Sequence, residues 1–378
     1  MAGISHIVQQ LVGKHAPDIH ARHGEGVPPA ESPQEAPKGG AHTVNGRGSD
    51  DQPPWFNGSP PLQPPSEVIP PTPYNPDSYS DLELDGGGKP WKLFNDNAPM
   101  VTAEDAASPE VFVPAHPSTD ARCPHDREEG YRYYNVSVPH LVPFILPAGD
   151  RRKNDAALIV LPGGAGYHLS WHKEGTHVAK WLNSMGYSAF VLKYRVPSKK
   201  PLPGRRDWSK PIIDGQRALR LVRSRAQQYG LNRDRIGAIG FGAGGVVAAH
   251  LSQSRLKYNA IDVVDEERFK PDYQLMIYAA DAPYPGLTAN VGPTFMAIAR
   301  DDPCSKADSA LQYFDTLEMR GGRVPNEIHV FAEGGHGFGD CTLYTDGMTK
   351  KEACAWMHNA AAYLRGVVLR EYDTMVPL

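Results

Sequence analysis

A glycine-rich turn between a strand-like run and a helical run is the first place in this sequence where chemistry is expected. Residues 235–240 contain β-branched residues and pass through a turn, Gly240 to Gly244, into an apolar helical stretch. A strand, a sharp turn and a helix are the setting of a nucleophile elbow, G-x-S-x-G, whose serine attacks a carbonyl carbon. In this register Gly242 stands where the serine belongs.

Two later segments follow in the order that such an acyl-transfer site requires. Asp301-Asp302-Pro303 ends one predicted strand, and His336 lies in a glycine-rich turn after the next one. Upstream, Leu161-Pro-Gly-Gly-Ala-Gly-Tyr167 follows a strand, and its small residues let backbone N–H groups approach an oxygen that gains negative charge. Each pattern alone is weak, but their order and setting together predict a site for acyl transfer.

The elements that must position these residues begin at Tyr131, where short β-branched runs start to alternate with helical stretches. This alternation is typical of a mainly parallel sheet with crossover helices on both faces, so we predict an α/β fold with eight strands. The predicted strands cover residues 131–136, 141–145, 156–161, 188–194, 235–240, 274–279, 294–299 and 327–331. The predicted helices cover residues 175–185, 208–229, 243–254, 306–320 and 350–370. In the second helix, the arginines are expected on a solvated face.

The first third of the chain has a different composition. Residues 1–128 hold 21 of the 36 prolines and a net charge of −10, whereas residues 129–378 carry +6. Repeated prolines interrupt helices and sheet ladders, which predicts a largely irregular acidic arm before the α/β domain. The arm is either a solvated leader or an extended segment clamped onto its own basic domain or a neighbouring subunit. Its apolar anchors are Trp55, Phe56, Tyr74, Tyr79, Trp91, Phe94 and Val111-Phe112-Val113.

Composition excludes several classes of partner. The net charge is −4 with a pI near 6.4, which gives no global basic field for nucleic acid or an anionic membrane. Mean hydropathy is −0.46, and no apolar run approaches the roughly 20 residues of a membrane-spanning helix. The histidines show no metal-binding spacing, so neither a metal nor another cofactor is expected.

Cysteine usage and the N-terminal residues favour an intracellular protein, either cytoplasmic or organellar. The four cysteines form no CxxC pair and no dense framework, so we expect no disulfide scaffold and a reducing compartment. Residues 1–26 lack the cationic start, apolar stretch and cleavage site of a secretory signal. An organelle presequence in these residues stays open.

With these motifs in view, the sequence resembles a known family, the α/β-hydrolases related to acetylxylan esterases and bacterial feruloyl esterases. The resemblance extends over residues 131–370 and leaves out the arm. It rests on the elbow and histidine turns and on residues 134–144, 158–167, 172–186, 190–195 and 214–223. It implies the α/β-hydrolase fold and hydrolysis of carboxylic esters.

Carried over residue by residue, the resemblance implies a catalytic triad with one member missing. His336 is the base, and Asp302 orients it, with Asp301 as the second choice. The backbone N–H groups of Ala243 and of Gly164 or Ala165 form the oxyanion hole. The nucleophile position falls on Gly242, which has no side-chain oxygen and cannot form an acyl-enzyme.

Two functions follow from this pattern. The first is an esterase-like pseudoenzyme that binds a small ester or carbohydrate ligand or serves as a structural subunit, with the arm holding a protein partner. The second is an ester hydrolase in which His336 activates water directly, or a serine esterase inactivated by the exchange of serine for glycine at 242. Ser170 and Cys304 are weaker candidates for a substitute nucleophile. The basic loop 195–207 is either an acidic-ligand site or a solvated loop.

Overall fold

A computed structural model of the protein describes residues 72–73, 85–95, 97–103, 109–113, 131–197, 206–279, 282, 290–319, 324–341 and 352–371. The chain divides into two compact units, Met1–Pro60 and Pro61–Leu378, and all of the described residues belong to the second. This division lies upstream of the predicted boundary at residue 128. Of the predicted arm anchors, Trp55, Phe56, Tyr74 and Tyr79 lie outside the described residues.

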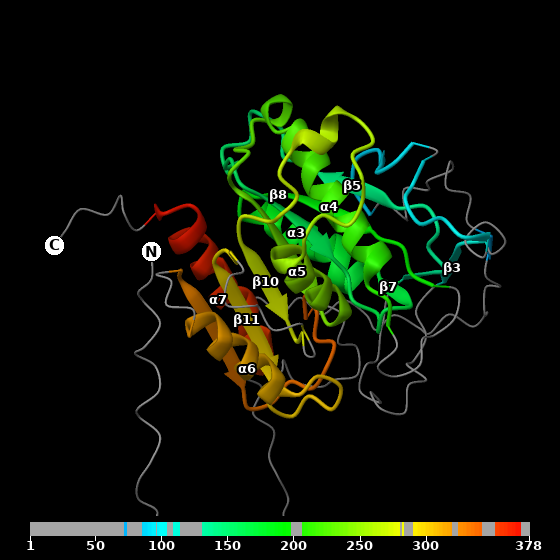
Figure 1. Ribbon diagram of the computed structural model, residues 1–378. Coiled ribbons are helices and arrows are strands. Elements are labelled where there is room, and N and C mark those ends of the chain that lie inside the picture. The colour runs from blue at the N-terminus through cyan, green and yellow to red at the C-terminus, as the bar shows by residue number, and fades with distance from the viewer. Residues whose placement is uncertain are drawn as a thin grey trace, which may run out of the picture. The chain divides into compact units, whose positions relative to one another are not determined.

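The main sheet has eight strands in the order β12-β11-β10-β9-β6-β8-β5-β2 (Figure 1). Neighbours from β12 to β8 run parallel, and β5 and β2 are antiparallel to their partners. The central strands are almost fully buried, as expected for a parallel sheet covered on both faces. The strands are β2 (Trp91–Lys92), β5 (His140–Phe144), β6 (Ala157–Leu161), β8 (Ser188–Lys193), β9 (Ile236–Phe241), β10 (Gln274–Ile277), β11 (Thr294–Ala299) and β12 (Asn326–Phe331).

Helices cover both faces of this sheet. Successive residues of a strand point to opposite faces. In β9, Gly240 lies against the backbone of Gly244 in α5, whereas Phe241 packs against Trp356 of α7, with ring centroids 5.7 Å apart. The helices and helical turns are η1 (His172–Thr176), α3 (His177–Ser184), α4 (Ser209–Ser224), η2 (Gln227–Tyr229), α5 (Ala243–Gln253), η3 (Val263–Glu266), α6 (Ala307–Glu318), η4 (Glu352–Ala355), α7 (Trp356–Tyr363) and η5 (Leu364–Val368).

One predicted strand belongs to a different sheet. The run predicted at 131–136 forms β4 (Arg132–Tyr134) of a small antiparallel sheet with β1 (Thr72–Pro73), β3 (Val111–Val113) and β7 (His168–Ser170). Its place in the main sheet is taken by β2, which comes from the predicted arm and pairs with β5. The prediction that this run belongs to the main sheet is therefore wrong, because antiparallel partners on either side hold it elsewhere.

Part of the acidic segment packs on its own chain. The Trp91 ring stacks on Tyr229 at a centroid distance of 5.5 Å, and the Arg225 guanidinium lies 4.3 Å from the Trp91 ring. Glu110 forms a fully buried ion pair with Lys193 of β8 at 2.6 Å. The described residues between 85 and 113 thus supply the edge strand β2 of the main sheet and a buried ion pair to β8.

The arginines of α4 are buried, and the prediction of a solvated face is wrong for three of them. Arg217, Arg220 and Arg223 are at most 5% exposed. Arg217 bonds Asp262 and Asp265, and Arg223 bonds Asp272. Buried charge is tolerated when it is paired and hydrogen-bonded, and these pairs fasten η3 and its flanking loops to α4.

A disulfide joins Cys341 to Cys354, and Cys304 is also disulfide-bonded. These bonds differ from the expectation of no disulfide scaffold and a reducing compartment. The missing signal is understandable, because 13 residues separate the paired cysteines and no dense framework surrounds them. Within the described part of the chain, no helix combines the length and apolar character needed to cross a membrane.

Candidate active site

The elbow lies between β9 and α5, and Gly242 is its turning residue. Its backbone has φ +46° and ψ −112°, and its carbonyl accepts the first bond of α5 from the Val246 N–H at 3.2 Å. Residues that carry a side chain rarely adopt a positive φ, whereas glycine does so at no steric cost. The chain therefore keeps the sharp strand-to-helix bend with the residue type that tolerates it best.

The acid and the histidine lie together at the carboxyl ends of the two neighbouring strands. Asp302 follows β11 and His336 follows β12, and Nδ1 of His336 lies 2.8 Å from Oδ2 of Asp302. The other oxygen of Asp302 accepts the N–H groups of Cys304 and Ser305 at 2.8 and 2.7 Å. The Asp302 carboxylate is fully buried, so these three contacts fix its orientation.

Asp301 has a different contact. Its Oδ1 accepts the backbone N–H of Gly335 at 2.8 Å, which ties the acid loop to the turn that carries His336. Of the two candidate acids, Asp302 is the one paired with the imidazole.

The nucleophile position faces the imidazole. A Cβ built on Gly242 would lie 3.6 Å from Nε2 of His336 and 3.7 Å from Cδ2 of Tyr278. These are ordinary van der Waals distances, so a Cβ fits at this position. A serine hydroxyl, one bond longer, could reach hydrogen-bond distance of Nε2. The structure thus brings together positions 242, 336 and 302 in the arrangement that the sequence predicts.

The glycine turn after β6 lies beside the start of α5. A Cβ at Gly244 would clash with the carbonyl of Leu161, which shows how closely the end of β6 approaches the helix. Gly164 and Ala165 both have positive φ, of +134° and +53°. The predicted oxyanion donors Gly164, Ala165 and Ala243 therefore lie on two adjoining backbone segments, and their role as donors stays a prediction.

Two buried residues of this site were missed by sequence reasoning. Glu174 of η1 accepts the Gly163 N–H at 2.7 Å, and Tyr278 donates its hydroxyl to Glu174 at 2.7 Å. The N–H of Gly163 is thereby engaged and does not contribute to an oxyanion hole. The one available signal was a carboxylate near the start of the predicted helix 175–185, and Tyr278 was hidden within a predicted strand.

The two substitute nucleophiles have different surroundings. Cys304 is disulfide-bonded and offers no thiol, which removes it as a candidate. Ser170 is buried in β7, and its backbone N–H donates to Gly163 at 3.0 Å. Ligating atoms of Asp302, Cys304 and His336 lie within 4.8 Å of one another. This trio does not suit a metal, because the sulfur is in a disulfide and the other two groups bond each other.

Tyr167 and Trp208 lie beside one end of the glycine turn after β6. Tyr167 lies edge to face with His168 at 4.9 Å, and a Cβ at Gly166 would touch Arg206 and Trp208. Burial lowers the pKa of His250 in α5 to about 4, so its imidazole is neutral at pH 7.

The basic loop proposed as an acidic-ligand site is only partly described. Residues 198–205 lie outside the described ranges. Its first residue, Arg195, is buried and paired with Asp214 at 2.7 Å, so this arginine serves the core rather than a ligand.

Comparisons with known proteins agree with the fold. The family model BD-FAE matches residues 144–274. An acetylxylan esterase of Xylanibacter ruminicola is 26% identical over 213 residues, which are 50% of this chain and 42% of that protein. The chain thus spans less than half the length of this curated relative.

Among solved structures, the acetyl ester-xyloside bifunctional hydrolase of Caldicellulosiruptor lactoaceticus is similar, with a TM-score of 0.51 and 26% identity. The match covers 74% of this chain and 97% of that one. The α/β-hydrolase MGS-M1 from a Medee basin deep-sea metagenome has a TM-score of 0.50 and 23% identity over 61% of this chain and 93% of its own. From its sheet order and these similar structures, the chain has the α/β-hydrolase fold, and its sequence is similar to that of esterases.

Proposed function

We propose that this chain is an esterase-like pseudoenzyme, which binds an acyl ligand at the old catalytic site without forming an acyl-enzyme. The observation that carries the proposal is the position of Gly242, whose Cβ would face Nε2 of His336 at 3.6 Å. Glycine has no side-chain oxygen that could attack an ester at this position. Loss of the serine from such a triad typically costs about a millionfold in kcat.

The rest of the site supports binding. Asp302 and His336 keep their hydrogen bond, and the glycine turn keeps its strained backbone beside α5. In disabled triads, the oxyanion hole and substrate binding alone account for a residual of about a thousandfold over water, which shows that binding outlasts the nucleophile. The relatives are named for acetylated xylan and xyloside, so we propose a small ester or an acylated carbohydrate as the ligand class.

Turnover and binding measurements on the full chain test the proposal. Native protein and the variant His336→Ala are compared on p-nitrophenyl acetate, and calorimetry follows binding of acetylated xylo-oligosaccharide. We expect binding without turnover at rates typical of esterases. Hydrolysis at such rates by the native chain, abolished in His336→Ala, would overturn the proposal.

A second candidate function rests on the Asp302–His336 pair itself. A histidine oriented by a carboxylate, with room for a Cβ 3.6 Å from its Nε2, can deprotonate water that then attacks the ester carbonyl. This reaction predicts slow hydrolysis that depends on His336. It also predicts no burst of p-nitrophenol, because no acyl-enzyme accumulates. A rate that is unchanged in His336→Ala would exclude it.

We also propose that the acidic segment contacts a protein partner or a neighbouring subunit, since residues 1–128 carry −10 and the rest +6. The disulfide between Cys341 and Cys354 favours the organellar part of the localisation prediction over the cytoplasmic part, because disulfides persist in oxidising compartments.

Light scattering of the full chain at low and high salt tests whether the acidic segment contacts a second copy of the chain. A monomer under both conditions would rule out a neighbouring copy as the partner.

A further inference from the structure

We propose that Glu174 and Tyr278 are positioning residues that hold the glycine turn and the histidine loop at a fixed separation. The glycine turn is residues 163–166, and the histidine loop is residues 335–341. The contribution of this link to acyl chemistry rests on the proposed function, whereas the link itself can be measured without any activity.

Glu174 is the centre of the link. The residue is 3% exposed, yet it carries a carboxylate in the interior beneath the site. Its Oε2 accepts the N–H of Gly163, and its Oε1 accepts the hydroxyl of Tyr278, both at 2.7 Å. A buried carboxylate is costly unless donors satisfy it, and charge-assisted bonds of this length are the strong ones. Both donors are therefore held where the carboxylate needs them.

The glycine turn fits closely against this carboxylate. A Cβ built on Gly163 would lie 2.6 Å from Oε2 of Glu174 and 2.6 Å from the carbonyl oxygen of Phe241. Real Cβ atoms do not approach oxygens so closely, so only glycine lets the backbone reach both. The turn is thereby placed against Glu174 on one side and the end of the elbow strand on the other.

Tyr278 connects the same carboxylate to the histidine loop. Its oxygen accepts the N–H of Gly339 at 3.1 Å, and its ring lies edge to face with His336 and Phe338 at 5.0 and 4.5 Å. Tyr278 has φ +38°, which is a strained value for a residue with a side chain. Such strain persists only where the surroundings fix it and is concentrated at functional sites. The hydrogen bonds thus run from Gly163 through Glu174 and Tyr278 to Gly339.

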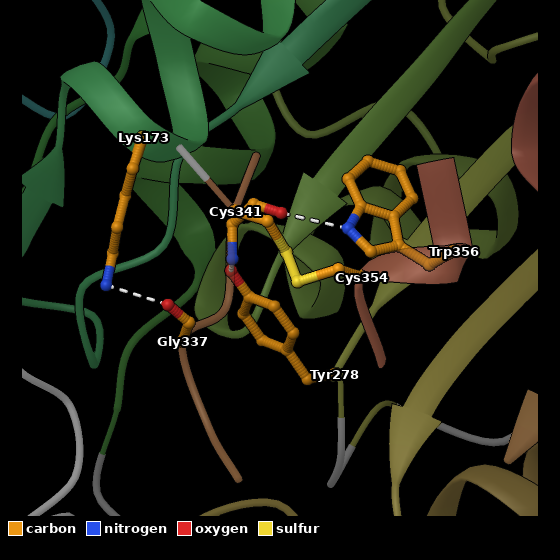
Figure 2. Close-up of a disulfide and its surroundings, with 7 residues drawn as sticks. Lys173, Tyr278, Gly337, Cys341, Cys354 and Trp356 are labelled. Atoms are coloured by element: carbon orange, nitrogen blue, oxygen red, sulfur yellow. Dashed lines mark hydrogen bonds between the residues drawn. A yellow bond between two sulfur atoms is a disulfide. The ribbon is translucent and has the colours of Figure 1, made fainter. Parts of the chain in front are cut away.

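The histidine loop is anchored from other sides as well (Figure 2). Lys173, the neighbour of Glu174, donates from its Nζ to the Gly337 carbonyl at 2.8 Å. The backbone carbonyl of Lys173 accepts the N–H of Asp340 at 3.1 Å. Trp356 donates its indole N–H to the Gly339 carbonyl at 2.9 Å, beside the disulfide of Cys341. Consecutive residues of η1 therefore bond the histidine loop and the glycine turn, although these two segments are more than 150 residues apart in sequence.

Amide hydrogen exchange of the native chain and of Tyr278→Phe tests the link. The variant keeps the ring and removes only the hydroxyl. Losing one buried bond corresponds to about a tenfold change in a local opening equilibrium. We expect exchange about tenfold faster at Gly339, which loses its acceptor, and also at Gly163, which Tyr278 does not touch. The second effect is the specific one, because it must pass through Glu174.

Tyr194→Phe is the matched control. Tyr194 is buried and donates its hydroxyl to the carbonyl of Pro162 at 2.6 Å, next to the same glycine turn, but it bonds no residue of the histidine loop. Its loss is expected to leave Gly339 exchange within about twofold of native. Glu174→Gln is the second variant. Glutamine has an NH2 donor in place of one of the two carboxylate oxygens, so one of the two donors loses its acceptor and at least Gly163 or Gly339 is expected to exchange faster.

Three results would contradict the link. These are unchanged exchange at Gly163 in Tyr278→Phe, an equal acceleration at Gly339 in Tyr194→Phe, or a uniform acceleration that includes buried strand amides such as that of Ile239. The functional consequence is measured in the Gly242→Ser background. There, Tyr278→Phe is expected to lower kcat about tenfold with KM unchanged, whereas Tyr194→Phe does not. Acyl-enzyme formation by the native chain would overturn the proposed function and leave the exchange result standing.

Discussion

The two halves of the site differ in what they keep. The half formed by β11 and β12 holds Asp302 and His336 in contact at 2.8 Å, with each loop fastened by further hydrogen bonds and by disulfides. The elbow half, between β9 and α5, keeps the sharp bend but carries glycine at its turning residue. The difference teaches that an elbow can carry glycine at its turning residue while the neighbouring acid and histidine stay paired.

Backbone strain explains why the elbow half can carry glycine while the other half keeps its acid and histidine. A side chain at φ +46° costs of order 1 kcal/mol or more, whereas glycine at position 242 relieves that cost. Asp302 cannot be exchanged so easily, because it satisfies two backbone N–H groups as well as His336. Removing it would leave buried donors without an acceptor.

The largest expected effect comes from completing the elbow. Gly242→Ser places a hydroxyl before Nε2 of His336, and we expect kcat/KM for p-nitrophenyl acetate to rise by about a hundred-thousandfold. Steady-state kinetics of the two purified proteins measures the gain. A silent variant that folds normally would show that the retained half is no longer competent.

Removing the acid from the half formed by β11 and β12 should nearly cancel that gain. In the Gly242→Ser background, Asp302→Asn keeps the shape of the side chain but loses the charge that orients the imidazole, and we expect kcat to fall by about ten-thousandfold. The matched control is Asp308→Asn, a surface carboxylate that is paired with Arg300. An equal loss in both variants would deny Asp302 a specific role.

Opening the disulfide loosens the histidine loop without touching the imidazole. The double variant Cys341→Ser, Cys354→Ser removes a cross-link between residues 13 apart, which is expected to cost about 3 kcal/mol of unfolding free energy. Urea unfolding of both proteins measures the change. A loss under about 0.5 kcal/mol would mean that the hydrogen bonds of the loop suffice without the cross-link.

The smallest effect is expected at the neighbouring aspartate. Asp301→Asn weakens one bond to the Gly335 N–H, so we expect a loss of about 1 kcal/mol in stability. In the Gly242→Ser background, kcat should change by no more than about threefold. A loss as large as that of Asp302→Asn would make Asp301 the acid instead.

Much of this fold could be predicted from local patterns. The runs at 188–194, 235–240 and 294–299 match β8, β9 and β11 to within one residue at each end, because buried parallel strands are short, apolar and bounded by turns. The run at 131–136 also forms a strand, but its sheet could not be predicted. Membership in a sheet depends on distant partners such as Val111–Val113 and His168–Ser170.

The site divides in the same way. The order of elbow, acid and histidine comes from motifs on strand ends, and the structure places those positions together. Glu174 and Tyr278 carry little local signal, since they bond each other across 104 residues. The paired cysteines are 13 residues apart and form no recognisable motif. The prediction of a solvated face for the arginines of α4 was wrong because their partners are also distant in sequence. Their carboxylate partners, Asp262, Asp265 and Asp272, lie 45 or more residues onward.

The most direct measurement of the central claim is intact mass after treatment with a fluorophosphonate that labels activated serines. The native chain and Gly242→Ser are treated side by side and compared by mass spectrometry of the whole protein and its peptides. The account predicts no adduct on the native chain and one adduct on residue 242 of the variant. A stoichiometric adduct on the native chain, lost in His336→Ala, would show that another residue serves as the nucleophile.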